Sequence, residues 1–100
     1  MLYRHGDVLI ARTEALPRNA KPRNGVTLAL GEVTGHSHRI QEPGAARLWE
    51  SGALTYLEVI APTATLIHEE HRAISLDRGL YRFWMQREYV PGDVSRWVED

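Results

Sequence analysis

The stretch that decides the fold spans residues 73–90 and reads AISLDRGLYRFWMQREYV. Along its second half, aromatic or apolar residues alternate with polar ones, which is the period of an extended strand. Asp77-Arg78-Gly79 interrupts it with residue types that are common in hairpin turns. We therefore predict two strands, 73–76 and 80–90, joined by this turn. The face expected in the core carries Tyr81, Phe83, Met85 and Tyr89.

Similar short runs, separated by Gly, Pro, Asn or Asp, fill the rest of the chain, and no window keeps a helical spacing of apolar residues. Val26, Leu28 and Leu30 share one face of an alternating segment, and Pro62 is expected to end the strand before it. The further strands expected are 8–12, 26–40, 47–50, 54–60 and 95–98. This pattern predicts an all-β fold, a small barrel or sandwich.

Composition narrows the class of protein. A chain of 100 residues has room for one hydrophobic core, so residues 1–100 are predicted to form a single β domain. The net charge of −1 gives no broad field for nucleic acid or an anionic membrane. The longest aliphatic run, residues 8–11, is too short to span a membrane. The absence of cysteine excludes disulfides and thiolate metal sites and fits a cytoplasmic location.

Four of the five histidines form two close pairs. His36 and His38 are two residues apart, so on a strand both imidazoles point to the same side. His68 and His71 are three residues apart, and neighbouring strands of a barrel would bring the two pairs together. We predict that they hold a divalent metal ion, zinc, manganese, iron or nickel. The alternatives are hydrogen-bonded or solvent-facing histidines near a turn, or an anion-binding pocket without metal. His5, beside a Gly-Asp turn, is expected on the surface.

Charged residues beside these pairs are candidates for further roles. Glu69 and Glu70 can serve as ligand, as hydrogen-bond partner of a ligand, or as general base. The segment is not a zincin helix, because position 72 is arginine and not histidine. Arg39 and Arg72 are candidates for orienting an anionic substrate such as a phosphate or carboxylate, although a solvent-exposed strand charge is the favoured interpretation of each.

The run at residues 31–42, GEVTGHSHRIQE, resembles the first metal motif of the cupin family, a glycine, then His-x-His, then Glu. By position, the resemblance implies His36, His38 and Glu42 as ligands, His68 as the fourth, and a cupin-like barrel. The glycine-to-histidine spacing is shorter than in cupins, and a clear second motif is missing. The whole chain also resembles small uncharacterised bacterial and phage proteins with this pattern and a later His-Glu-Glu-His, which implies no activity.

Two main functional hypotheses follow. The first is a metal-dependent enzyme, hydrolase-like or cupin-like, that acts on a small anionic or phosphate-containing substrate. The second is a non-catalytic β module for oligomer assembly or partner docking, with structural histidines and with Trp49, Trp84 and Trp97 as interface anchors. A homo-oligomer is expected. Nucleic-acid binding through the basic loop at residues 12–23 is a weaker third hypothesis, since no aromatic residue is interleaved for base stacking.

Overall fold

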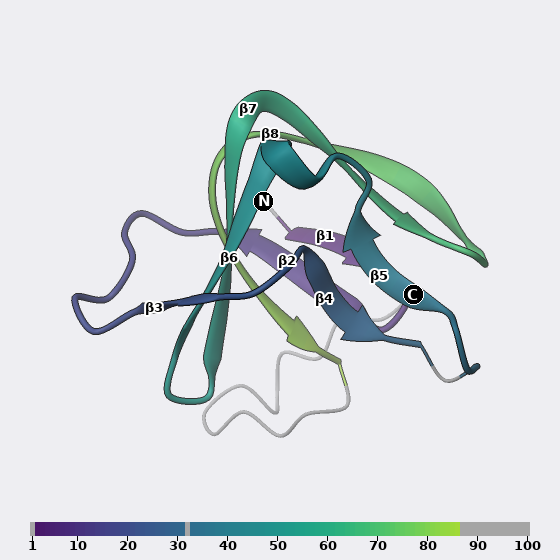
Figure 1. Ribbon diagram of the computed structural model, residues 1–100, viewed down its shortest axis with the longest axis horizontal. Coiled ribbons are helices and arrows are strands. Elements are labelled where there is room, and N and C mark those ends of the chain that lie inside the picture. The colour runs from purple at the N-terminus through teal and green to yellow at the C-terminus, as the bar shows by residue number, and fades with distance from the viewer. Residues whose placement is uncertain (1, 32, 87–100) are drawn as a thin grey trace.

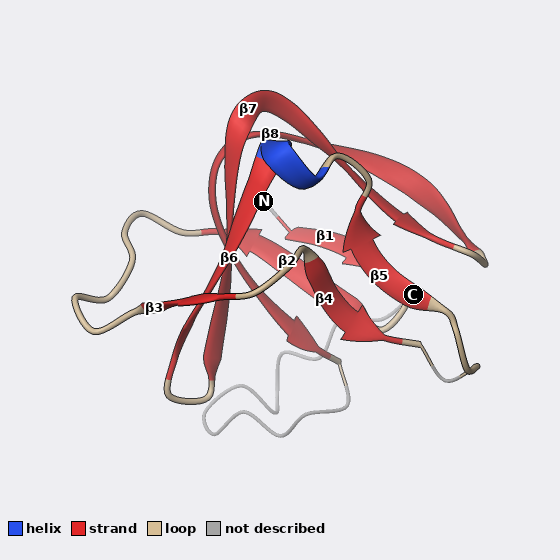
Figure 2. Cartoon of the chain, in the orientation of Figure 1, coloured by secondary structure: helices blue, strands red, loops and turns tan. Residues whose placement is uncertain are grey.

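The computed structural model describes residues 2–31 and 33–86, which form one strongly curled antiparallel sheet (Figure 1). This half-barrel confirms the prediction of a small all-β fold. A single 3-10 turn, η1 (Pro43–Ala45), interrupts the strands of the described residues (Figure 2), and no helix there is long and apolar enough to cross a membrane. The strands are β1 (Leu2–His5), β2 (Val8–Arg12), β3 (Lys21–Arg23), β4 (Thr27–Leu30), β5 (Ser37–Ile40), β6 (Ala46–Ser51), β7 (Leu54–His68) and β8 (His71–Met85).

Two long strands, β7 and β8, run through the whole sheet and arch over it in Figure 1. The strand order is β1-β2-β8-β7-β5-β4, and β3 pairs with β6 beside it. The first half of β7 pairs with β6, whereas its second half pairs with β5. The second half of β8 pairs with β2. Strand β7 thus changes its outer partner along its length, whereas β8 has β2 as its outer partner along its second half.

A β-bulge lies where β7 changes partner. Val59 pairs with Gly79 and Thr63 with Asp77, so three residues of β7 oppose a single residue of β8. Pro62 lies inside this bulge, where its missing N–H leaves no ladder bond unmade. The strand therefore continues past the proline, and the prediction that Pro62 ends it was wrong.

The predicted turn at residues 77–79 was also wrong, because these residues lie inside β8. Gly79 has a φ of 147°, and a Cβ there would collide with the Arg12 guanidinium, which stacks over the Tyr81 ring at 4.9 Å. This glycine thus permits a close approach of another side chain and does not make a turn. The turn between β7 and β8 is formed by residues 69 and 70.

The core combines residues from most strands. Tyr81 and Phe83 are buried as predicted, with Leu28. Leu30, expected on the same face as Leu28, is 77% exposed, because a register shift in the pairing of β4 with β5 breaks the alternation. Tyr89 and the expected strand 95–98 lie outside the described residues. The buried apolar residues of the central sheet include Val8, Ile10, Ile40, Leu48, Leu57, Val59, Ala64, Leu66 and Leu76.

Two leucines of β7 give a direct test of this core. Leu57 is fully buried whereas Leu54, in the same strand, is 42% exposed. We expect Leu57→Ala to lower the free energy of unfolding by about 2–5 kcal/mol, since it leaves a cavity, and Leu54→Ala to lower it by less than about 1 kcal/mol. Urea denaturation of both variants measures the difference. Equal losses would contradict the burial of Leu57 and the exposure of Leu54.

Candidate metal centre

All five histidines of the chain gather at one end of the curled sheet. His5 ends β1, His38 lies in β5, His68 ends β7 and His71 begins β8, while His36 directly precedes β5. The seven ring pairs in contact have centroids between 4.3 and 6.3 Å apart. The two predicted histidine pairs therefore converge, and a fifth histidine joins them.

Tight hairpins place three of these rings. The two-residue turn between β7 and β8 makes His68 and His71 a cross-strand pair, with ring centroids 4.7 Å apart. A second two-residue turn, Gly6-Asp7, places His5 at the end of β1. A Cβ on Gly6, whose φ is 63°, would lie 2.6 Å from Nε2 of His71. Glycine at this position lets the backbone pack directly against the histidine rings.

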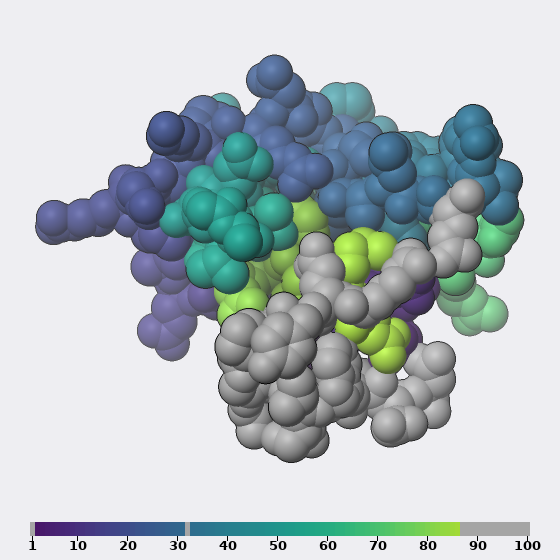
Figure 3. Space-filling model, turned by 90° about the horizontal axis from the view of Figure 1, so that it is seen from below, coloured from purple at the N-terminus to yellow at the C-terminus, as the bar shows by residue number. Residues whose placement is uncertain are grey.

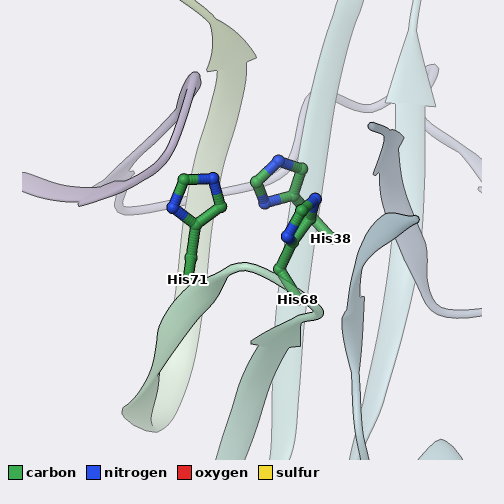
Figure 4. Close-up of side chains that lie close together, drawn as sticks. All are labelled: His38, His68 and His71. Atoms are coloured by element: carbon green, nitrogen blue, oxygen red, sulfur yellow. The ribbon is translucent and has the colours of Figure 1, made fainter. Parts of the chain in front are cut away.

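One group of three histidines could hold a metal ion. His38, His68 and His71 each present a ring nitrogen within 4.8 Å of the other two (Figure 4). In a tetrahedral zinc site, with Zn–N bonds of about 2.0–2.1 Å, neighbouring nitrogens lie about 3.3 Å apart, so small side-chain rotations would bring these rings onto an ion. The same three rings line a cavity of about 160 Å³, together with His36 and Glu70. Three imidazoles beside a cavity leave room for a further ligand.

A second group, His36, His68 and Glu69, overlaps the first because it also uses His68. Glu69 is already engaged there. One carboxylate oxygen accepts the Ser37 backbone N–H at 3.1 Å and the other pairs with Arg39 at 2.9 Å. Backbone hydrogen bonds, first at Glu69 itself and then at Ser37, lower the pKa of its carboxyl. The all-histidine group therefore has fewer existing bonds to give up.

Burial keeps the inner rings neutral. His5 and His38 are 2% and 3% exposed. Desolvation, reinforced by the neighbouring imidazoles, lowers the pKa of each to about 4. Burial also lowers the pKa of His68. At neutral pH these imidazoles are therefore uncharged, and an uncharged imidazole has one ring nitrogen with a lone pair that can bind a metal.

Hydrogen bonds constrain which nitrogens carry the protons. Nδ1 of His5 lies 2.9 Å from Nδ1 of His38, so one of these two atoms must donate a proton to the other. Nδ1 of His68 accepts the Glu70 backbone N–H at 2.9 Å. An ion at His68 has to displace that bond, either by binding Nδ1 itself or by binding Nε2, whose proton then moves to Nδ1. The Glu70 carboxylate lies 3.1 Å from Nδ1 of His36 at the cavity wall.

Three of the predicted site residues, Glu42, Arg39 and Arg72, lie outside both histidine groups. Glu42 is not in either histidine group, since its carboxylate accepts hydrogen bonds from Thr65 N at 2.9 Å and Thr65 Oγ1 at 2.8 Å, and these bonds lower its pKa. Arg39 is paired with Glu69, whereas Arg72 lines a neighbouring cavity.

The prediction that His5 lies on the surface was wrong. Residues 2–5 form a strand that was not predicted, and Gly6-Asp7 is the turn of a hairpin and not the start of one strand. The signal was present: the short run Leu2-Tyr3 before a Gly-Asp pair and another apolar run after it. In the same way, two histidines flanking a two-residue turn predict a cross-strand pair, although Glu-Glu is not a typical hairpin turn.

The tryptophans of the docking hypothesis and the basic loop of the nucleic-acid hypothesis are not among the residues described at the histidine cavity. Trp49 is half-buried, and its Nε1 donates to Glu58 at 3.0 Å. Trp84 is half-buried beneath Arg82, and Trp97 lies outside the described residues. The loop between β2 and β3 projects from the body of the molecule (Figures 1 and 3). Interface and nucleic-acid roles for these features stay predictions.

Comparisons with known proteins give a family but no activity. Residues 4–86 match a family model described as a domain of unknown function, DUF8820, and the chain belongs to this family. The matched range includes all five histidines. No curated protein and no solved structure matches the chain.

The low pKa values of His5 and His38 predict how the stability of the metal-free protein depends on pH. Each folded-state pKa, about 4, lies below the ordinary histidine pKa of 6.5, so the unfolded chain binds more protons in this interval. Stability is therefore full above pH 6.5 and falls as the pH drops toward 4, by about 1.4 kcal/mol per pH unit for each histidine that titrates independently. Urea denaturation between about pH 7 and pH 5 measures this slope, in a range where carboxylates contribute little. A flat profile would contradict buried neutral imidazoles.

Proposed function

We propose that this protein holds a divalent metal ion, zinc as the first candidate, on His38, His68 and His71, in a centre of the kind that activates water. One observation carries the proposal: three imidazoles from three strands present nitrogens within 4.8 Å of one another at a cavity of about 160 Å³. A structural zinc site has four protein ligands, whereas a catalytic site has three and keeps a position open. A set of three beside a cavity supports the second kind.

The neighbouring groups support the same interpretation. A bound divalent ion would lower the pKa of a water molecule toward neutrality and polarise a substrate oxygen. Glu70 lines the cavity and does not belong to the proposed ligand set, so its carboxylate is placed to accept a proton. His36, 3.1 Å from that carboxylate, is placed to hold it in position. This arrangement suits a hydrolase-like reaction on a small substrate.

The proposal drops two members of the cupin-like ligand set, His36 and Glu42, and adds His71. That set would use Glu42, whose two carboxylate oxygens are instead bonded to Thr65, and would leave His71 out. Here His71 is a ligand, and His36 instead lies beside the Glu70 carboxylate. Glu42 belongs to the cupin-like set alone and His71 to the proposed set alone, so mutating these two residues distinguishes the sets.

Metal affinity tests the ligand set. Wild-type protein, stripped and titrated with zinc in a calorimeter, should bind one ion per chain and should melt at a higher temperature when loaded, because the ion binds only the folded form. His38→Ala and His71→Ala should each weaken binding by more than about 100-fold, beyond the 10–100-fold typical of losing a group that only supports a ligand.

Glu42→Gln is the matched control and should leave zinc affinity unchanged within a few-fold. Loss of binding in Glu42→Gln with binding retained in His71→Ala would restore the cupin-like set and reject ours. No binding by the folded wild-type protein would reject the metal centre altogether.

His5 orients His38 in this proposal. If Nδ1 of His38 donates to Nδ1 of His5, then Nε2 of His38 carries the lone pair that a metal needs. The side-chain oxygen of asparagine occupies nearly the place of a histidine Nδ1 and is also an acceptor, so His5→Asn should keep zinc affinity within a few-fold. His5→Leu removes the acceptor and should weaken affinity about 10–100-fold.

Circular dichroism of both variants checks that the fold is intact before the zinc titrations are compared. Equal affinities in the Asn and Leu variants would show that His5 only fills space.

A further inference from the structure

A second cavity lies on the other side of His71. Its volume is about 570 Å³, and it shares Gly6, Asp7 and His71 with the smaller cavity of the metal centre. Its volume falls in the range of small-molecule sites, about 300–1,000 Å³. A molecule in the second cavity would therefore touch the edge of the proposed metal centre at His71.

Two arginines from facing elements line this cavity, Arg4 on β1 and Arg72 on β8. Nη1 of Arg4 donates to Oε1 of Gln86 at 2.5 Å and reaches the Gly6 carbonyl oxygen at 3.4 Å, so this guanidinium is held at the cavity wall. Arg72 is exposed and makes no ion pair with any residue in the described part of the chain. Arg39, in contrast, is neutralised by Glu69 at 2.9 Å.

The charges at this cavity favour an anion. Among the described residues that line it, Asp7 is the one carboxylate and Arg4 and Arg72 are two guanidinium groups, and an ion on the three histidines would add further positive charge. Guanidinium groups bind carboxylates and phosphates through paired N–H donors, which makes arginine the usual residue for planar recognition of such groups.

We propose that the Arg4/Arg72 cavity binds the oxyanion of a small phosphate- or carboxylate-bearing substrate, whose other end reaches the metal centre past His71. This inference rests on the proposed metal centre and adds the chemical class of the substrate and the residues that select it. It also chooses between the two arginines that flank the histidine pairs: Arg72 is the anchor and Arg39 is not.

Calorimetric titration of the zinc-loaded protein with inorganic phosphate, and separately with acetate, tests the cavity and distinguishes the two oxyanions. Arg72→Ala should weaken binding of the preferred anion about tenfold or more, and Arg72→Lys should recover part of it. Arg18→Ala removes the same charge from the exposed loop between β2 and β3, and Arg39→Ala removes it beside the histidines. Both controls should bind the anion as the wild-type protein does.

Zinc affinity, measured on the same variants, separates this inference from the metal centre. If zinc binds normally but neither anion binds, or if Arg72→Ala and Arg18→Ala behave alike, the anion cavity is overturned and the metal centre stands. Loss of anion binding in Arg39→Ala with full binding in Arg72→Ala would also overturn it. If zinc does not bind, phosphate binding by the metal-free protein that Arg72→Ala removes would support the cavity on its own.

Discussion

The antiparallel pairing of β7 with β8 is the constraint on which the rest of the structure depends. It is the longest ladder in the described residues, and β2, β5 and β6 all attach to one of these two strands. The bulge that contains Pro62 divides this ladder. The two halves of the ladder can therefore follow different directions while β7 and β8 stay paired. Curling at this point turns a flat sheet, which could bury only one face, into a half-barrel with an enclosed core.

The same ladder fixes the candidate site, because its closed end is the turn between His68 and His71. Register is strict there: a shift of one residue would turn one of the two rings to the opposite face. The price of this arrangement is the burial of polar rings, since His5 and His38 are almost wholly removed from water. Their mutual hydrogen bond and their neutral state reduce that cost, and a bound ion would reduce it further by satisfying nitrogen lone pairs.

Much of the fold class and part of the site could be predicted from sequence periodicity. Alternation placed Tyr81 and Phe83 in the core, and the spacing of His36 and His38 directed both toward one cavity. The errors came from features that the alternation of apolar and polar residues does not reveal. Pro62 and Gly79 are typical turn residues, yet one occupies a bulge and the other makes room for Arg12, and both depend on partner strands distant in sequence. His5 was missed because its strand has only four residues and its importance comes from His38, thirty-three positions away.

The contact between His5 and His38 also has a meaning for the fold. β1 and β5 are separated in the sheet order by β2, β8 and β7, and the two are not paired by backbone hydrogen bonds. Nδ1 of His5 nevertheless lies 2.9 Å from Nδ1 of His38, so at this end side chains close the curl that the backbone leaves open. An ion on His38, His68 and His71 would join β5, β7 and β8 at the same place. Closure of the half-barrel and assembly of the proposed metal centre would therefore be one physical event, and a substitution that loosens either should loosen both.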